Sequence, residues 1–342
     1  MNRRSLLSSA AFLSAGFGSQ ASRAQSASAL VWSEIPAVGP SPAPRYDHSL
    51  SAAGGERALV LFGGRDANGS PLGDTWIFRR SSNEWVAVTG DGPSPRFGHA
   101  VAADSEGDVI WLFGGQAGET FHNDLWAFDA RERSWTLVEY GSGNAPAPRY
   151  GTSLVRTDTG ELILSHGFTF SGRFNDTWIW TADAGWTDIS PEDGSERPLN
   201  RCLHESVWDE NNGAMLLYGG CSSGYGPCPQ GDLWRFDPAA RAWSLLDPQA
   251  APEGRMNPAL VYDGGRGQTM LIGGLTDTGY DSGCWSLTDA SSPSWTPVEA
   301  SGGPSARASH DACVTGPHLY LFGGTGDSGV TGDLWTTRLD GR

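Results

Sequence analysis

A unit of just over 50 residues repeats six times along this 342-residue chain. An arginine that follows a turn rich in proline or serine marks each copy, and successive arginines lie 51 to 54 residues apart. These arginines are Arg45, Arg96, Arg149, Arg201, Arg255 and Arg307. A fixed period of this length is typical of propellers and solenoids, in which each unit buries its apolar face against the next. The repeat therefore restricts the fold more than any other feature of the sequence.

Three further landmarks follow each arginine. An apolar run ends in Gly-Gly, as at Gly63-Gly64, although the third copy reads His166-Gly167. An Asp-x-Trp unit comes next, and only the fifth copy, Gly283-Cys284-Trp285, lacks its aspartate. These aspartates are Asp74, Asp124, Asp176, Asp232 and Asp333, and the tryptophans that close the first five units are Trp85, Trp135, Trp186, Trp243 and Trp295. Four short apolar runs per unit, separated by turn residues, predict four strands.

Six four-stranded units predict an all-β fold, a six-bladed β-propeller. The sixth unit ends at Arg342 without a closing tryptophan of its own. Residues 30–35 can supply the missing strand, because Trp32 precedes Trp85 by 53 residues, in phase with the other closing tryptophans. We therefore expect the N-terminal strand to complete the last blade and to close the ring, which would hide the sheet edges.

These motifs resemble the kelch repeat, which has Gly-Gly after an apolar strand and spaced aromatic residues further on. The resemblance covers residues 30–342. It implies a six-bladed kelch-type propeller with four-stranded blades. It does not imply one activity, because kelch propellers serve as protein-binding platforms, oxidases, sugar epimerases and lyase-like specifier proteins.

Residues 1–24 are typical of an export signal, whose end is uncertain up to residue 29. Arg3 and Arg4 precede a short apolar stretch, and small residues follow at positions where a signal peptidase could cut. We interpret the segment as a twin-arginine signal, and an ordinary secretory signal with two arginines is the alternative. The expected protein is bacterial, exported by a cleaved signal peptide, and periplasmic or secreted.

The chain contains no lysine, and its formal net charge is −16. The absence of lysine excludes Schiff-base chemistry and a Walker-type phosphate site. The acidic charge argues against nucleic acid as a partner. No stretch outside the signal approaches the length of a transmembrane helix. We therefore expect a monomer that binds no nucleic acid and does not insert into a membrane.

The repeat arginines predict a binding site at one mouth of the central channel. Because strands alternate direction within a blade, the loop before each inner strand and the loop after each Gly-Gly open on the same face. Six guanidinium groups around this mouth would suit a carboxylate, sulfate or phosphate, so we predict an anionic small molecule or an acidic protein segment as the ligand. The alternative is that each arginine pairs with the aspartate of an Asp-x-Trp unit and ties neighbouring blades together.

The loops after Gly-Gly differ from copy to copy, and rigid scaffolds often carry binding residues on such loops. Aromatic residues beside arginine and aspartate would suit a polar organic ligand or a peptide. Variation on an exposed surface is the alternative for each residue. Our candidate ligand-binding residues on these loops are Arg65, His122, Phe168, Arg173 and Tyr280.

Histidine and cysteine allow further predictions. Four copies place a histidine three residues after the arginine, at His48, His99, His204 and His310. Four imidazoles around a channel could bind a metal, but hydrogen bonding on separate strands is the alternative that we adopt, so we predict no metal ligands and no cofactor.

Cys221 and Cys228 bracket a short loop that an oxidising compartment would close by a disulfide. Three cysteines remain, Cys202, Cys284 and Cys313, so at least one thiol is unpaired.

Two classes of function stay open. The leading one is a binding module, because the arginines and loops supply contacts while no serine-nucleophile or zinc-protease motif is present. The second is a small-molecule isomerase or lyase in the same pocket, as the resemblance to sugar mutarotases and specifier proteins allows. Ring-opening of a sugar needs only a positioned acid and base, and no residue is singled out for these roles.

Overall fold

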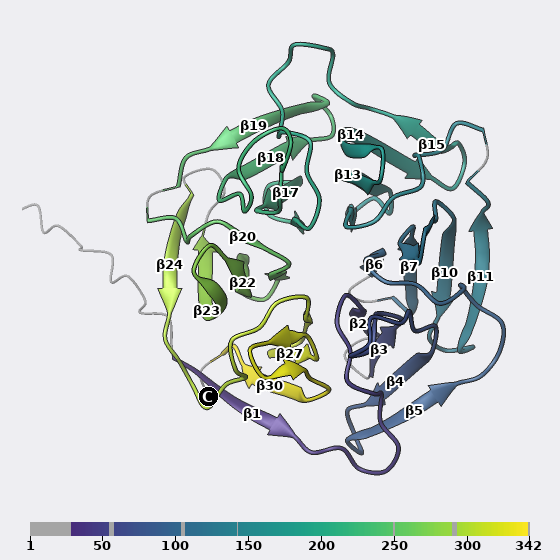
Figure 1. Cartoon of the computed structure of the whole chain (residues 1–342), viewed down its shortest axis with the longest axis vertical. Helices are drawn as coiled ribbons and strands as arrows, with labels where there is room; N and C mark the ends of the chain where they lie inside the picture. The colour runs from purple at the N-terminus through teal and green to yellow at the C-terminus, as the bar shows by residue number, and fades with distance from the viewer. Residues whose placement is uncertain are drawn as a thin grey trace, which may run out of the picture.

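The computed structural model describes residues 29–340 apart from 55–57, 104–106, 142, 249 and 289–292. The predicted export signal, residues 1–24, lies outside the described residues. Six sheets are arranged radially around a central channel, and each has four main strands (Figure 1). The prediction of a six-bladed propeller with four-stranded blades is confirmed. No helix in the described part of the chain is long and apolar enough to cross a bilayer.

The first three blades follow one another along the chain, each built from the channel outwards. Blade one consists of β2 (Ser49–Ala53), β3 (Ala58–Phe62), β4 (Thr75–Arg79) and β5 (Glu84–Val88). Blade two consists of β6 (Ala100–Ala103), β7 (Val109–Phe113), β10 (Leu125–Asp129) and β11 (Ser134–Glu139), with the hairpin β8 (Gln116–Ala117) and β9 (Thr120–Phe121) on its loop. Blade three consists of β12 (Ser153–Arg156), β13 (Leu162–Thr169), β14 (Gly172–Thr181) and β15 (Gly185–Asp188).

The other three blades complete the circle. Blade four consists of β16 (Glu205–Asp209), β17 (Ala214–Tyr218), β18 (Leu233–Asp237) and β19 (Ala242–Leu246). Blade five consists of β21 (Ala259–Asp263), β22 (Gln268–Thr276), β23 (Gly279–Thr288) and β24 (Ser294–Val298), with β20 (Arg255–Met256) paired to β22. Blade six consists of β26 (Asp311–Thr315), β27 (His318–Phe322), β30 (Leu334–Arg338) and β1 (Leu30–Ile35), with β28 (Thr325–Gly326) and β29 (Gly329–Val330) on its loop and β25 (Ala300–Ser301) beside β1.

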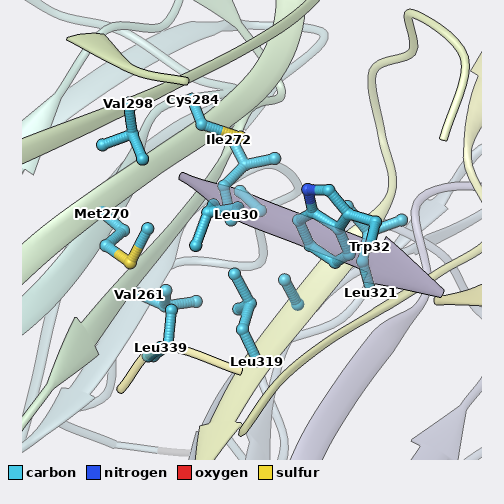
Figure 2. Close-up of a cluster of buried hydrophobic side chains, with 12 residues drawn as sticks. Leu30, Trp32, Val261, Met270, Ile272, Cys284, Val298, Leu319, Leu321 and Leu339 are labelled. Atoms are coloured by element: carbon cyan, nitrogen blue, oxygen red, sulfur yellow. The ribbon is translucent and has the colours of Figure 1, made fainter. Parts of the chain in front are cut away.

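The N-terminal strand closes the ring as predicted. β1 pairs antiparallel with β30, with Trp32 opposite Thr337 and Ile35 opposite Leu334. Figure 1 shows β1 on the outer edge of blade six, beside the end of blade five. Leu30 and Trp32 are buried in a cluster with Met270 and Leu319 of the last two blades (Figure 2). The first strand of the described chain therefore joins the last two blades to each other.

The closing tryptophans pack between neighbouring blades. The indole of Trp135 in blade two lies edge-on to Phe62 of blade one, with ring centres 5.2 Å apart. Trp295 of blade five meets Tyr218 of blade four in the same way, at 5.5 Å. Aromatic pairs prefer this tilted geometry. The spacing of the tryptophans therefore reflects one contact that is repeated around the ring.

The second glycine of each Gly-Gly is required by a close approach of backbones. Gly64 has a φ of 96°, in the left-handed region, and its N–H donates to the carbonyl of Arg96 in the next repeat, at 2.9 Å. A Cβ atom at this position would lie 2.7 Å from the Cβ atom of His48. A larger residue would push the Gly-Gly turn away from the inner strand of its own blade.

Candidate functional site

The inner strands of the six blades enclose a central cavity of about 630 Å³. Its lining includes the residues that lie two and three positions after each repeat arginine, and in every blade except the fifth also the residue four positions after it. The six arginines themselves are not among the described residues that line it.

One end of the cavity is bounded by a closed ring of backbone hydrogen bonds. The residue two positions after each arginine has a φ between 47° and 61°, and its N–H donates to the carbonyl of the matching residue one blade back, at 2.8 to 3.0 Å. The six members are Asp47, Gly98, Gly151, Leu203, Asn257 and Ser309. Leu203 is the member that least suits this left-handed backbone. Sequence reasoning missed the ring, because only its glycine, asparagine and aspartate members carry a backbone signal.

The repeat arginines are buried, so they do not form the predicted ring of exposed guanidinium groups. Each pairs with an aspartate of its own blade at 2.6 to 2.7 Å. The Arg45 side chain, for example, is 0% exposed and donates to both carboxylate oxygens of Asp74. The aspartates are Asp74, Asp124, Asp176, Asp232, Asp281 and Asp333. Burial with bidentate pairing supports the alternative interpretation, in which the arginines are structural.

Each arginine also links two blades. The Arg149 N–H and carbonyl bond to His122 and Gly115 of blade two, whereas its guanidinium donates to the His166 carbonyl and to Asp176 of blade three. The other five arginines repeat this pattern. We call each Arg–Asp pair with these backbone bonds an inter-blade clamp. The clamp explains the Asp-x-Trp motif, since in five blades the indole N–H of the tryptophan donates to the same carboxylate.

Carboxyl groups line the cavity where guanidinium groups were predicted. Glu205, Asp311 and Asp47 all belong to its lining. Burial, together with the charges of Asp311 and Asp47, raises the pKa of Glu205 well above its usual value. Burial raises the pKa of Asp311 to about 7, although the N–H groups of Leu50 and Ala312 donate to its carboxylate. In the described part of the chain, the cavity wall therefore carries these carboxyl groups and Arg156, and none of the six repeat arginines.

The four repeat histidines are buried and neutral. Burial, with the nearby Arg96, lowers the pKa of His99 to about 3, and burial with Arg307 does the same for His310. His99 bonds to the Ser49 hydroxyl of the preceding blade at 3.0 Å, and His204 bonds to Ser153 at 2.9 Å. Among the described residues, no group of three or more histidine, cysteine or acidic side chains could hold a metal ion. The geometry supports the hydrogen-bonding interpretation for His99 and His204.

Arg65, a predicted site residue, lies next to the ring of backbone bonds. Its guanidinium forms an ion pair with Asp47. It stacks on two aromatic rings, 4.6 Å from the centre of Tyr46 and 4.1 Å from that of Phe97. Burial opposes the charge of Arg65, but Asp47 raises its pKa on balance. Arg65 is therefore held in place, with its side chain 26% exposed.

The loops that follow each Gly-Gly open on one face of the propeller, which we call the loop face. Three phenylalanines from two blades lie together on this face. Phe121 of β9 lies 4.9 Å from Phe170 and 6.2 Å from Phe168, between ring centres. Phe170, at the turn between β13 and β14, is 67% exposed. We call Phe121, Phe168 and Phe170 the aromatic platform. Exposed apolar side chains that adjoin one another mark interaction sites more often than isolated ones do.

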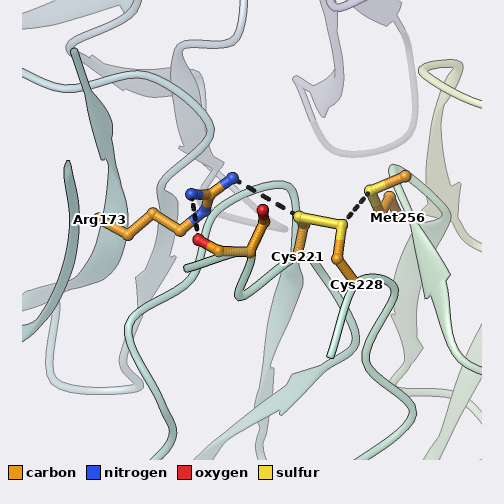
Figure 3. The surroundings of a disulfide bond; sticks show 5 residues. Arg173, Cys221, Cys228 and Met256 are labelled. Atoms are coloured by element: carbon orange, nitrogen blue, oxygen red, sulfur yellow. Dashed lines mark hydrogen bonds between the residues drawn. A yellow bond between two sulfur atoms is a disulfide. The ribbon is translucent and has the colours of Figure 1, made fainter. Parts of the chain in front are cut away.

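Arg173 adjoins the aromatic platform and reaches into blade four. Its guanidinium carbon lies 5.3 Å from the centre of the Phe168 ring. One guanidinium nitrogen donates to the Ser223 carbonyl at 2.7 Å, and another contacts Cys221 Sγ at 3.6 Å (Figure 3). Among the described residues, no carboxylate forms an ion pair with Arg173. The loop face therefore holds an uncompensated positive charge beside the exposed ring of Phe170 and two half-buried rings.

The remaining predicted site residues are dispersed. His122 belongs to the inter-blade clamp of Arg149, because its carbonyl accepts the Arg149 N–H at 3.0 Å. Tyr280 lies in the β22–β23 hairpin and lines a separate pocket of about 440 Å³ with Asp281 and Cys284. The predicted disulfide joins Cys221 and Cys228. The other three cysteines are free and buried.

Comparisons with known proteins agree with this architecture. The family described as the KLHDC2/KLHL20/DRC7 Kelch-repeats domain matches residues 24–220 and 208–341. An F-box/kelch-repeat protein of Arabidopsis thaliana is 30% identical over 84% of this chain and 67% of its own length. Adagio protein 3 of the same plant is 28% identical over 90% of this chain, but over 51% of its own length. The leucine-zipper-like transcriptional regulator 1 homolog of Drosophila melanogaster is 26% identical over 84% of this chain and 30% of its own length. The chain thus spans about two thirds of the first relative and about half or less of the other two.

Proposed function

This chain belongs to the kelch-repeat family, and we propose that it is a protein-interaction module that binds a peptide segment of a partner on the loop face of blades two to four. The aromatic platform, with Phe170 exposed, beside the uncompensated Arg173 is the observation that carries this proposal. We propose further that the chain acts in the periplasm or outside the cell. The Cys221–Cys228 disulfide supports an oxidising compartment.

The charges and contacts of the loop face suit a segment with an apolar or aromatic side chain next to a carboxylate. The apolar side chain would pack on Phe170 and Phe121, whose rings meet edge-on. The carboxylate would accept from the Arg173 guanidinium, which matches such groups well. In this proposal the acidic ligand expected from the sequence binds at Arg173 on the loop face, away from the buried clamp arginines.

Selection of phage-displayed peptides on the immobilised chain tests the proposal. We expect the selected peptides to combine an apolar residue with Asp or Glu. Fluorescence anisotropy should then show that Phe170→Ala weakens their binding by about 30-fold, since truncating an aromatic anchor costs about 2 kcal/mol. Arg173→Ala should weaken binding most for the peptides that carry a carboxylate. Phe170→Ala should unfold at nearly the wild-type temperature, because Phe170 is mostly exposed.

Leu245→Ala is the matched control, because Leu245 is also an exposed apolar side chain, at 50%, but it lies on the outer strand β19. It should bind the selected peptides as the wild type does. Peptides that bind Phe170→Ala and Leu245→Ala equally well would place the interaction elsewhere and overturn the proposal.

A small-molecule isomerase in the central cavity is the second candidate. The observation that favours it is the pair of carboxyl groups in the cavity wall, one of which, Asp311, has a pKa of about 7. An acid or base is most effective when its pKa lies near the working pH. Exchange spectroscopy by NMR on reducing sugars would show accelerated anomer interconversion with the wild type and none with Glu205→Gln. No acceleration by the wild type across acidic and neutral sugars would exclude this candidate.

A further inference from the structure

Cys202 lies directly opposite Cys221 in the fold. The two residues form an antiparallel bridge in which Cys202 N–H donates to the Cys221 carbonyl at 3.1 Å and Cys221 N–H donates to the Cys202 carbonyl at 2.8 Å. The side chains of residues paired in this way lie on the same face, with Cα atoms about 5.5 Å apart. That separation is the one at which disulfides usually form. Cys202 is nevertheless a free thiol.

Cys221 is already bonded to Cys228, and the two sulfurs differ in their surroundings (Figure 3). Cys202 and Cys221 are buried, whereas Cys228 is exposed. Cys228 Sγ lies 3.5 Å from the thioether of Met256. A buried free thiol therefore stands beside the buried end of a disulfide whose other end reaches solvent.

The Arg173 guanidinium is shared by both buried sulfurs. It contacts Cys221 Sγ at 3.6 Å. Burial raises the pKa of the Cys202 thiol, and the charge and hydrogen bond of Arg173 oppose that rise. A guanidinium beside a sulfur favours the thiolate, which is the nucleophile in disulfide exchange. The site thus holds a buried thiol on the residue paired with Cys221, a disulfide, and a guanidinium that contacts the Cys221 sulfur.

We propose that Cys202, Cys221 and Cys228 form a thiol–disulfide exchange site in which Cys221 changes its partner from Cys228 to Cys202. The Cys202 thiolate attacks Cys221 Sγ, a Cys202–Cys221 bond forms, and the Cys221–Cys228 bond breaks. Cys228 leaves as a thiolate and takes up the proton that Cys202 has lost, so the step needs no oxidant or reductant. It opens the Cys221–Cys228 loop and presents a thiol at the surface.

The released Cys228 defines the substrate class, which is an accessible disulfide on a peptide or a small molecule. The Cys228 thiolate would attack one sulfur of that disulfide, form a mixed disulfide and expel the other sulfur as a thiolate. Cys228 can be reached because its loop runs along the surface of the loop face, next to Arg173. This activity does not depend on peptide binding at the aromatic platform.

Trapping of the native protein with N-ethylmaleimide, followed by non-reducing peptide mapping, tests the exchange. We expect the label on Cys228, together with a Cys202–Cys221 linked peptide. The rate of labelling should rise about tenfold per pH unit until the Cys202 thiol ionises, because the attacking species is the thiolate. Oxidised glutathione in place of maleimide should give a mixed disulfide at Cys228.

Cys202→Ser should abolish both the label and the mixed disulfide, while Cys313→Ser, which removes another buried free thiol, should leave them unchanged. Circular dichroism and the thermal midpoint report whether each variant is folded, and Cys202→Ala replaces the serine variant if serine disturbs the bridge. A label confined to Cys202 with the Cys221–Cys228 bond intact would overturn the proposal. Equal labelling of Cys228 in the wild type and in a folded Cys202 variant would do the same.

Discussion

Replacing Arg149 with alanine is expected to lower the free energy of unfolding by about 3–5 kcal/mol, the usual effect of removing one partner of a buried ion pair. The Arg149 side chain is fully buried and donates to both carboxylate oxygens of Asp176, at 2.6 and 2.8 Å. Its guanidinium also lies 4.0 Å from the centre of the Phe174 ring. Truncation leaves the His166 carbonyl without its guanidinium donor and the Asp176 carboxylate with only the Trp178 indole N–H among its described donors. Urea denaturation would report the loss as a lower midpoint.

Arg131→Ala is the control for this prediction. Arg131 pairs with Asp108, but its side chain is 79% exposed, so its loss should change the free energy of unfolding by less than about 1 kcal/mol. Equal midpoints for the two variants would contradict a stabilising role for the inter-blade clamp. The clamp links two blades at each of six junctions, so a large loss at one junction would also show how the ring is held closed.

The repeat pattern predicted the propeller because each landmark reports a contact that recurs at every blade junction. Trp32 could be assigned to the last blade from its spacing to Trp85 alone, because that spacing matches the period of the other closing tryptophans. No knowledge of a long-range contact was needed. Even the aspartate absent from the fifth Asp-x-Trp unit could have been located. Asp281 follows Arg255 by 26 residues, the interval that separates Arg307 from Asp333.

The site was harder to predict, because its residues depart from the repeat. Phe121 and Phe170 come from different blades, and no pattern in the sequence shows that their rings touch. The sequence also does not show in which direction the repeat arginine side chains point. A guanidinium at the start of an inner strand can point to the channel or back into its own blade, and the aspartate of that blade, which pairs with it, decides between the two directions. The burial of the six repeat arginines could consequently not be read from their spacing.

Glu205→Gln is expected to raise the free energy of unfolding by about 1–3 kcal/mol at about pH 8 and to leave it nearly unchanged at about pH 4. Burial and the nearby Asp311 and Asp47 raise the folded-state pKa of Glu205 above its unfolded value. Between those two values the folded chain binds more protons than the unfolded chain, so stability falls as the pH rises. Because glutamine carries no charge, the Glu205→Gln variant does not lose this stability as the pH rises.

The aspartates of the inter-blade clamps affect stability in the opposite direction at lower pH, where they make the free energy of unfolding rise with pH. Burial alone would raise the pKa of Asp124, but its bonds to Arg96 lower it on balance, and Asp232 responds to Arg201 in the same way. These groups stabilise the fold above their unfolded pKa of about 4, and the contribution is lost as the pH falls further. Stability should therefore be greatest at about pH 4, where the loss due to Glu205 and Asp311 begins, and Glu205→Gln should make the fall above that pH smaller. Urea midpoints on both sides of that pH would test it against Glu119→Gln, which alters an exposed carboxylate. A constant difference between Glu205→Gln and the wild type at every pH would mean that the pKa of Glu205 is the same in the folded and unfolded chains, and would contradict the prediction.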